Sequence, residues 1–318
     1  MDDKPPILLP YTVSSEWVAP LRSVLTTELP DVTIEHASTP PASRAAIETA
    51  PIVVAFGLPD DLLACAEELQ WVQALSAGVN TYDVDAIAAA DAMLTTVSGI
   101  HAQPIAEQVL GYMFAFERGI HTGIRQQQRA VWERYTVGEL ADATLGIVGV
   151  GAIGQRIAEL ASAIGIQTLG IKRNPDTGGD CVDELFGPEG LYELLLRADY
   201  VVLACPLTDE TRGLIGREEL QTMNEWGVLI NIARGDVVDE ETLIHALQYG
   251  WIRGAALDVF STEPLPADSP LWKLSNVIVT PHMAGLTPHY MERSAAIIAQ
   301  NYRTFVAGDL DAMQNRIV

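Results

Sequence analysis

The chain has 318 residues, 48% of them apolar, so it is long enough for two domains with buried cores and is not expected to be disordered. Its 42 acidic and 19 basic residues give a formal net charge of −23, which argues against nucleic-acid binding, because phosphate contacts need a basic face. The acidic residues are scattered and form no block, so the charge does not indicate an acidic tail that binds partners.

The basic residues include very few lysines, which are Lys4, Lys172 and Lys273. An acidic surface poor in lysine is expected of a protein that works in molar salt, where the Debye length is about 3 Å and repulsion between like charges is screened. The cysteines lie far apart with no metal-ligand spacing, and neither a signal peptide nor a membrane-spanning run is visible. The sequence therefore predicts a halophilic, cytoplasmic protein with no bound metal and no membrane contact.

The first part of the chain alternates short apolar runs with helical patterns. Strands are predicted at residues 7–10, 52–56, 71–75 and 93–97, with helices at residues 59–68 and 83–90 between them. This alternation indicates a parallel sheet covered by helices on both faces.

One long helix is predicted over residues 103–129, with Ala106, Val109, Leu110, Met113 and Phe116 on one side. It would connect two domains. Its apolar side would form either a homodimer surface or a packing face on its own domain, and the sequence leaves both readings open.

A second alternating series predicts six strands, at residues 145–149, 168–172, 200–204, 228–232, 255–259 and 277–280. Six strands with helices between them indicate a dinucleotide-binding sheet of the Rossmann type. The last helix, residues 288–306, is expected to return to the first domain. We therefore expect an α/β protein with a smaller, discontinuous, flavodoxin-like substrate domain (residues 1–98 plus 287–318) and a dinucleotide-binding domain (residues 99–286).

A glycine-rich turn follows the first strand of the second series. Gly149, Gly151 and Gly154 form G-x-G-x-x-G, and a helix is predicted directly after it, at residues 155–163. The first glycine permits the tight turn, the second lets the backbone approach a pyrophosphate, and the third lets helix and strand pack closely. Ala152 and Ile153 lie within the same turn. The motif predicts a nicotinamide dinucleotide site.

The end of the next strand bears on the choice of cofactor. An enzyme that uses NAD usually carries Asp or Glu about 20 residues after the turn, to bind the ribose 2′-hydroxyl. Here the strand ends in Lys172, Arg173 and Asn174, with no acid. The planar guanidinium of Arg173 suits a 2′-phosphate. We therefore predict that NADP(H) is preferred and that NAD(H) is possible.

Three later strands end in polar residues. Arg234 follows the strand at 228–232, and His282 follows that at 277–280. Asp258 lies near the end of the strand at 255–259, and Glu263 follows that strand. Ligands of open α/β sheets bind at the carboxyl ends of the strands, so these side chains are expected to converge on the nicotinamide.

On these motifs, and on the segments at residues 202–208 and 211–215, the chain resembles the D-isomer-specific 2-hydroxyacid dehydrogenase family over nearly its whole length. The resemblance implies that His282 is the general acid that protonates the carbonyl oxygen as hydride arrives. It implies that Glu263 orients the imidazole and favours its charged form, and that Arg234 binds the 2-oxoacid. Asp258 would contact the nicotinamide carboxamide.

The resemblance also implies further contacts. Additional cofactor contacts are expected from Ala204, Cys205, Pro206, Thr211, Ile232, Ala233, Ala284 and Gly285, with Arg234 and His282 beside the nicotinamide. The substrate carboxylate would be received by backbone amides of the loop Leu75, Ser76, Ala77 and Gly78, together with Arg234 and His282.

The function predicted is reduction of a small-molecule 2-oxoacid to a D-2-hydroxy acid by a homodimeric enzyme. Glyoxylate, hydroxypyruvate and branched 2-oxoacids all remain open. The alternative is a non-catalytic, dinucleotide-sensing corepressor of the same family. Because the carboxylate loop and His282 fall in different domains, catalysis would require the domains to close, with hinges near residues 98–99 and 285–288.

Overall fold

The computed structural model describes residues 4–79, 81–176, 179 and 181–318. The chain divides into two compact units, one of Met1–Ile100 with Thr287–Val318 and the other of His101–Leu286. The first division thus falls two residues after the expected position, and the second falls between residues 286 and 287. Within the described residues, no helix is both long and apolar enough to cross a membrane.

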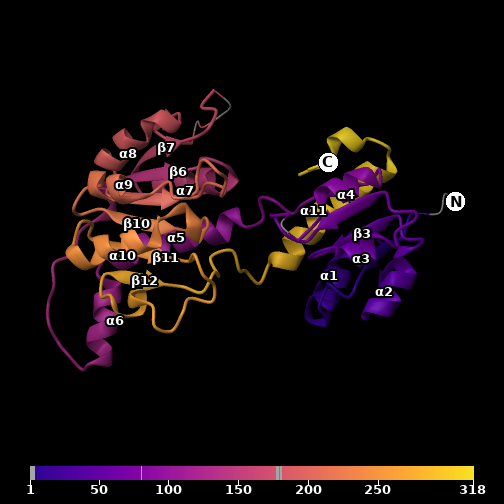
Figure 1. The fold of residues 1–318 in the computed structure, drawn as a ribbon, viewed down its shortest axis with the longest axis horizontal. Helices are drawn as coiled ribbons and strands as arrows, with labels where there is room; N and C mark the ends of the chain where they lie inside the picture. The colour runs from indigo at the N-terminus through magenta and orange to yellow at the C-terminus, as the bar shows by residue number, and fades with distance from the viewer. Residues whose placement is uncertain (1–3, 80, 177–178, 180) are drawn as a thin grey trace. The chain divides into compact units, whose positions relative to one another are not determined.

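The first unit is a five-stranded parallel sheet between two layers of helices (Figure 1). Its strands are β1 (Ile7–Leu9), β2 (Ile34–His36), β3 (Ile52–Ala55), β4 (Trp71–Ala74) and β5 (Met93–Thr95). Their order, β2-β1-β3-β4-β5, is the flavodoxin-like order. Apolar side chains of α1 (Ser15–Glu28) and α11 (Tyr290–Val306) pack on one face, and those of α2 (Pro40–Ile47), α3 (Asp60–Leu63) and α4 (Val84–Ala89) on the other.

The second unit is a seven-stranded parallel sheet in the order β12-β11-β10-β9-β6-β7-β8 (Figure 1). The strands are β6 (Thr144–Val148), β7 (Gln167–Ile171), β8 (Glu184–Phe186), β9 (Tyr200–Leu203), β10 (Val228–Asn231), β11 (Gly254–Leu257) and β12 (Val277–Val279). From β8 to β11 this is the Rossmann order, which reverses direction between β6 and β9. Both sheets confirm the predicted fold class.

Helices cover both faces of this second sheet. Side chains of α5 (Ala102–Glu117) and α7 (Ala152–Ser162) belong to the core on one face, and those of α8 (Leu191–Arg197), α9 (Arg217–Thr222) and α10 (Glu240–Tyr249) to the core on the other. The exposed α6 (Ile120–Gln128) joins neither core: all of its residues are described and none is buried. The apolar side predicted for the long helix, including Ala106, Val109, Met113 and Phe116, lies on α5 and belongs to the core of the second unit, so it packs within its own unit.

The prediction of one helix over residues 103–129 is wrong. The helix ends at Glu117, and Gly119 takes a left-handed conformation with φ of 60° before α6 begins. A Cβ on Gly119 would lie 2.5 Å from the ring of Tyr135, so glycine is needed here both for the backbone angle and for space. The helical spacing of apolar residues continues across the break, so the sequence pattern does not reveal the turn.

Other differences concern short elements. Within the described residues the second sheet has seven strands, not the six predicted. The strand that was missed is β8 at the edge, which is three residues long and half buried, too short to stand out as an apolar run. The edge strand β2 was missed for the same reason of length. The helix predicted over residues 59–68 covers only Asp60–Leu63. Glu67 and Glu68 would place negative charge at a helix C-terminus, where the helix dipole disfavours it.

Candidate active site

The glycine-rich turn lies at the carboxyl end of β6. Gly149 has φ of 107°, and a Cβ there would lie 2.6 Å from the backbone nitrogen of Cys205. A Cβ on Gly154 would lie 2.2 Å from the carbonyl oxygen of Gly149, so the helix α7 can approach the strand only without a side chain at this position. A Cβ on Gly151 would meet nothing within 4 Å. The turn is thus closed on the protein side and open above Gly151, where the N-terminus of α7 begins, which suits a bound pyrophosphate.

The basic strand end lies directly beside this turn. The backbone N–H groups of Gly149 and Val150 both donate to the carbonyl oxygen of Ile171, at 3.0 Å each. Lys172, Arg173 and Asn174 follow Ile171 immediately. Their position next to the glycine turn is the one from which a side chain can contact the adenosine ribose of a bound dinucleotide.

An acidic residue stands near the strand end. The guanidinium of Arg173 lies 3.9 Å from the carboxylate of Glu210, and both side chains are more than three-quarters exposed. The hydroxyl of Thr208 donates to the same carboxylate at 2.6 Å, and this bond, aided by the charge of Arg173, lowers the pKa of Glu210. Glu210 therefore stays ionised beside Arg173, a feature that sequence inspection missed.

The loop after β9 lies against the glycine turn. The amide of Ala204 donates to the carbonyl oxygen of Val148 at 2.9 Å. Cys205 is buried, and burial raises the pKa of its thiol, which keeps the thiol protonated. The hydroxyl of Thr211 donates to the carbonyl oxygen of Pro206 at 2.6 Å, so Thr211 shapes this loop. Its contact with a cofactor stays a prediction.

Arg234 lies at the end of a turn that Asn231 shapes. The buried side chain of Asn231 accepts from the amide of Ala233 and donates to the carbonyl oxygen of Arg234, both at 3.0 Å. A Cβ on Gly235 would lie 1.9 Å from the carbonyl carbon of Phe260, so this turn packs tightly on the segment that follows β11. Arg234 itself is exposed, and its guanidinium donates to the carbonyl oxygen of Ala233 at 2.6 Å.

His282 and Glu263 form a hydrogen-bonded pair. Nδ1 of His282 lies 2.7 Å from Oε2 of Glu263, while Oε1 of Glu263 accepts from the amide of Phe260 at 3.0 Å. With Nδ1 held by the carboxylate, Nε2 is the ring nitrogen left for proton transfer. The His282 side chain is half exposed, which leaves the ring accessible.

Arg234, Glu263 and His282 all follow strands at the same edge of the second sheet. Asn231 pairs with Leu257 in β10 and β11, and Leu257 pairs with Val279 in β12. The segments that carry Arg234, Glu263 and His282 therefore leave the sheet side by side. Asp258 is buried, and its carboxylate accepts from the backbone amides of the His282 loop.

The predicted carboxylate loop lies in the other unit, after β4. The carbonyl oxygen of Leu75 accepts from the hydroxyl of Tyr290 at 2.5 Å, and that of Ser76 accepts from the amide of Val97 at 3.3 Å. Ala77 and Gly78 are exposed, and a Cβ on Gly78 would meet nothing within 4 Å. The loop is thus held by its carbonyl groups and open on its outer side.

His101 is a further histidine near the site that sequence analysis left unassigned. It precedes α5 and is half buried, and a Cβ on Gly285 would lie 2.9 Å from Cδ2 of its ring. Burial lowers the pKa of His101 below its ordinary value of 6.5. Just below pH 6.5 the folded state therefore binds fewer protons than the unfolded state, so this residue makes the protein less stable as the pH falls.

We expect His101→Asn to lose less stability than the parent protein between pH 7 and pH 5, because the substitution removes this protonation. Chemical denaturation at each pH measures the effect. The control is His245→Asn, at an exposed position, which should follow the parent curve. Equal losses in His101→Asn and the parent would show that the burial of His101 has no such consequence.

Comparisons with known proteins assign the chain to a family. Residues 110–284 match the model of the D-isomer specific 2-hydroxyacid dehydrogenase NAD binding domain, which is more than half of the chain. The chain is 34% identical to a glyoxylate reductase of Aeropyrum pernix, over 78% of this chain and 76% of that one. The chain belongs to the D-isomer specific 2-hydroxyacid dehydrogenase family.

Other family members extend the comparison. A D-isomer specific 2-hydroxyacid dehydrogenase from Xanthobacter autotrophicus, solved in complex with NADPH and MES, has a TM-score of 0.83 and 30% identity, covering 99% of this chain and 98% of that one. A D-3-phosphoglycerate dehydrogenase of Methanocaldococcus jannaschii is 34% identical over 79% of this chain but 48% of its own length. The chain thus spans about half the length of that relative.

Proposed function

We propose that the protein is an NAD(P)H-dependent reductase that converts 2-oxoacids to D-2-hydroxy acids. The observation that carries the proposal is the pair of His282 and Glu263, which follows the same edge of the Rossmann sheet as the glycine turn. A proton donor and a dinucleotide site on one edge are what carbonyl reduction requires.

A nicotinamide dinucleotide held at the glycine turn would, when bound, supply the hydride that reduces C2 of the oxoacid. His282 gives the proton on Nε2 to the carbonyl oxygen, and the product is the 2-hydroxy acid. Glu263 accepts from Nδ1, holds the ring orientation and stabilises the imidazolium before the proton leaves. Arg234 polarises the carbonyl or binds the carboxylate through charge-assisted hydrogen bonds.

The substrate carboxylate is assigned to the backbone amides of residues 75–78. This loop and His282 belong to different units, so the reaction requires the two to close around the substrate and exclude water. Of the hinges proposed, that near residues 98–99 lies just before the first unit division, between residues 100 and 101, and that near residues 285–288 spans the second, between residues 286 and 287.

A panel of 2-oxoacids tests the function, with glyoxylate, hydroxypyruvate and a branched 2-oxoacid each assayed with NADPH and NADH at low and molar salt. Consumption of the reduced cofactor with at least one acid is expected, faster at high salt if the acidic surface is halophilic. Binding of cofactor without turnover of any acid would contradict the proposal and favour a dinucleotide-sensing binding protein.

We propose that NADPH is preferred over NADH, on the position of Arg173 beside the glycine turn. Removing a charge-assisted hydrogen bond costs about 1.5–3 kcal/mol, so Arg173→Ala should lower the NADPH to NADH ratio of kcat/KM about ten- to a hundredfold. Glu210→Gln should raise the ratio, because it removes a negative charge 3.9 Å from Arg173.

The control for both variants is Arg44→Ala, which removes an exposed ion pair with Asp61 in the other unit. It should leave the ratio unchanged. An unchanged ratio in Arg173→Ala would refute the assignment of Arg173 to the 2′-phosphate.

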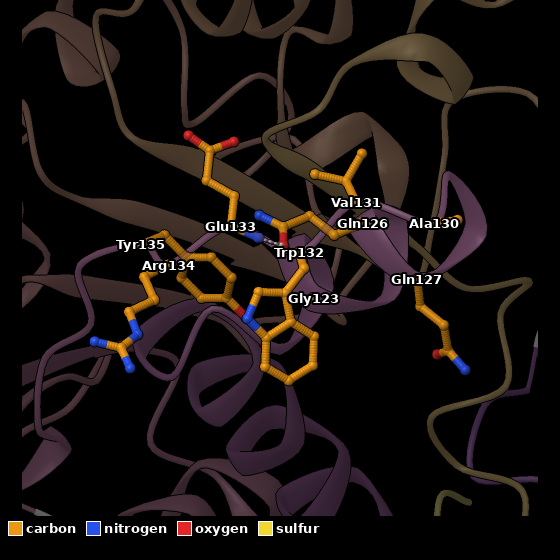
Figure 2. Close-up of a pocket in the computed structure, with 9 residues that line it drawn as sticks. All are labelled: Gly123, Gln126, Gln127, Ala130, Val131, Trp132, Glu133, Arg134 and Tyr135. Carbon is orange, nitrogen blue, oxygen red and sulfur yellow. Dashed lines mark hydrogen bonds between the residues drawn. The ribbon is translucent and has the colours of Figure 1, made fainter.

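A homodimer is also proposed, with α6 and the segment after it as the contact surface. Ile124 is half exposed and Trp132 almost fully exposed. Trp132 lines an open pocket together with Gly123, Gln126 and Tyr135 (Figure 2). The guanidinium of Arg125, on α6, donates to the carbonyl oxygens of Leu274 and Val277, which fixes this apolar surface on its own unit.

The proposed location of the protein is the cytoplasm.

A further inference from the structure

A chain of hydrogen bonds runs from the core helix α5 to the loop that carries His282. The hydroxyl of Tyr112, on α5 and buried, lies 2.5 Å from Oγ1 of Thr280, and Oγ1 of Thr280 donates to Oδ1 of Asp258 at 2.5 Å. A threonine hydroxyl has one proton. Because Thr280 gives that proton to Asp258, Tyr112 must donate to Thr280, and the chain has a single direction.

Asp258 is the acceptor at the end of this chain. Besides Thr280, its carboxylate accepts from the amides of Met283 at 3.0 Å and Ala284 at 2.9 Å. Its backbone carbonyl accepts from the amide of His282 at 2.8 Å. One buried residue thus holds three consecutive amides of the loop, and the hydroxyl of Thr280 fixes the orientation of its carboxylate.

The loop needs this support because His282 has an unfavourable backbone. Its φ is 49°, in the left-handed region that residues other than glycine rarely adopt. Such a conformation persists only where the surroundings over-determine it. A relaxed backbone would rotate the imidazole away from Glu263, which lies on a different segment.

Tyr112 is suited to the role of permanent donor. Burial raises the pKa of its phenol, and the negative charge of Asp258 raises it further. The phenol therefore stays protonated across the range in which histidine titrates.

We propose that Tyr112 and Thr280 are positioning residues for His282, acting through Asp258 to hold the backbone that aims Nδ1 at Glu263 and Nε2 at the substrate. This inference rests on the proposed function for its catalytic consequence only. The geometry of the pair of His282 and Glu263 can be measured without turnover.

The test uses variants that change single atoms. Tyr112→Phe removes one hydroxyl from the full-length protein, and Thr280→Val replaces the hydroxyl by a methyl of the same shape. Thr280→Ser keeps the hydroxyl and is the rescue variant. The control is Tyr302→Phe, which removes a buried hydroxyl that donates to the carbonyl oxygen of Pro5 at 2.8 Å in the other unit.

Two readouts are measured for each variant. The first is kcat with the best 2-oxoacid, beside the Kd of NADPH from its fluorescence. The second is the downfield NMR signal of the His282 Nδ1–H in protein labelled with ¹⁵N at histidine, identified by its loss in His282→Gln. We expect Tyr112→Phe and Thr280→Val to lower kcat ten- to a hundredfold and to shift or broaden the signal, with the Kd changed less than twofold.

Thr280→Ser should restore kcat to within about threefold of the parent, and Tyr302→Phe should match the parent in both readouts. An unchanged Nδ1–H signal in Tyr112→Phe and Thr280→Val would overturn the inference, as would equal damage in Thr280→Ser and Thr280→Val. If Thr280→Val does not fold, Tyr112→Phe decides by the same signal. A parent protein that turns over no 2-oxoacid would refute the proposed function, while the signal would still test the positioning.

Discussion

His282→Gln should lower kcat by about a thousandfold while the affinity for the reduced cofactor stays within a factor of two or three. General acid catalysis by a positioned side chain contributes about 10²- to 10⁴-fold, and glutamine cannot give up a proton at neutral pH. Glutamine also keeps a similar size and a hydrogen-bonding group, so Glu263 would retain a partner. Steady-state kinetics with the best 2-oxoacid and fluorescence titration with NADPH separate the two effects.

The protein contains its own control for this experiment. His289 and Glu292 form a second histidine–carboxylate pair, with Nδ1 at 3.2 Å from Oε2, on the exposed start of α11. His289→Gln should leave kcat unchanged, because this pair belongs to the other unit and follows no strand of the Rossmann sheet. A loss of less than tenfold in His282→Gln, or an equal loss in His289→Gln, would remove His282 from the mechanism.

Arg234→Gln should lower kcat/KM for the 2-oxoacid by about 10²- to 10³-fold, the effect of removing one donor that stabilises charge in the transition state. Arg234→Lys keeps the charge but loses the planar fork that matches a carboxylate, so it should recover only part of this loss. The Kd of NADPH should change little in either variant. Kinetics over a wide range of substrate concentration provide the measurement.

The matched control is Arg303→Gln, which removes an exposed guanidinium paired with Glu28 at 2.8 Å in the other unit. It should behave as the parent. Full activity in Arg234→Lys would show that charge alone is needed, and a loss confined to cofactor affinity in Arg234→Gln would contradict substrate binding by this residue.

The parts of the fold that could be predicted are those encoded by local patterns. The glycine spacing and the apolar runs of β6, β9, β10 and β11 are contiguous in sequence, and the rule that ligands bind at strand ends then groups Arg234, Glu263 and His282. The break at Gly119 escaped prediction because its reason is Tyr135, sixteen positions later, whose ring fills the space of a side chain. The edge strands β2 and β8 are too short for their periodicity to be read.

The parts of the site that escaped prediction depend on contacts between distant positions. Tyr112 lies 168 residues from Thr280, and as an apolar-side residue of α5 it looks like any other core aromatic. Its hydroxyl acquires a role only when α5 packs on the sheet beside β12. Glu210 likewise meets Arg173 only after the loops that follow β7 and β9 leave neighbouring parts of one sheet edge.

The reaction proposed for the protein is hydride transfer to C2 of a 2-oxoacid with formation of the D-alcohol. It is tested most directly with hydroxypyruvate, or the best chiral-forming acid of the panel, and a reduced cofactor that carries deuterium at both C4 positions. Mass spectrometry and chiral chromatography of the product should find one deuterium at C2 and the D-enantiomer alone. A product without deuterium at C2, or the L-enantiomer, would contradict the account.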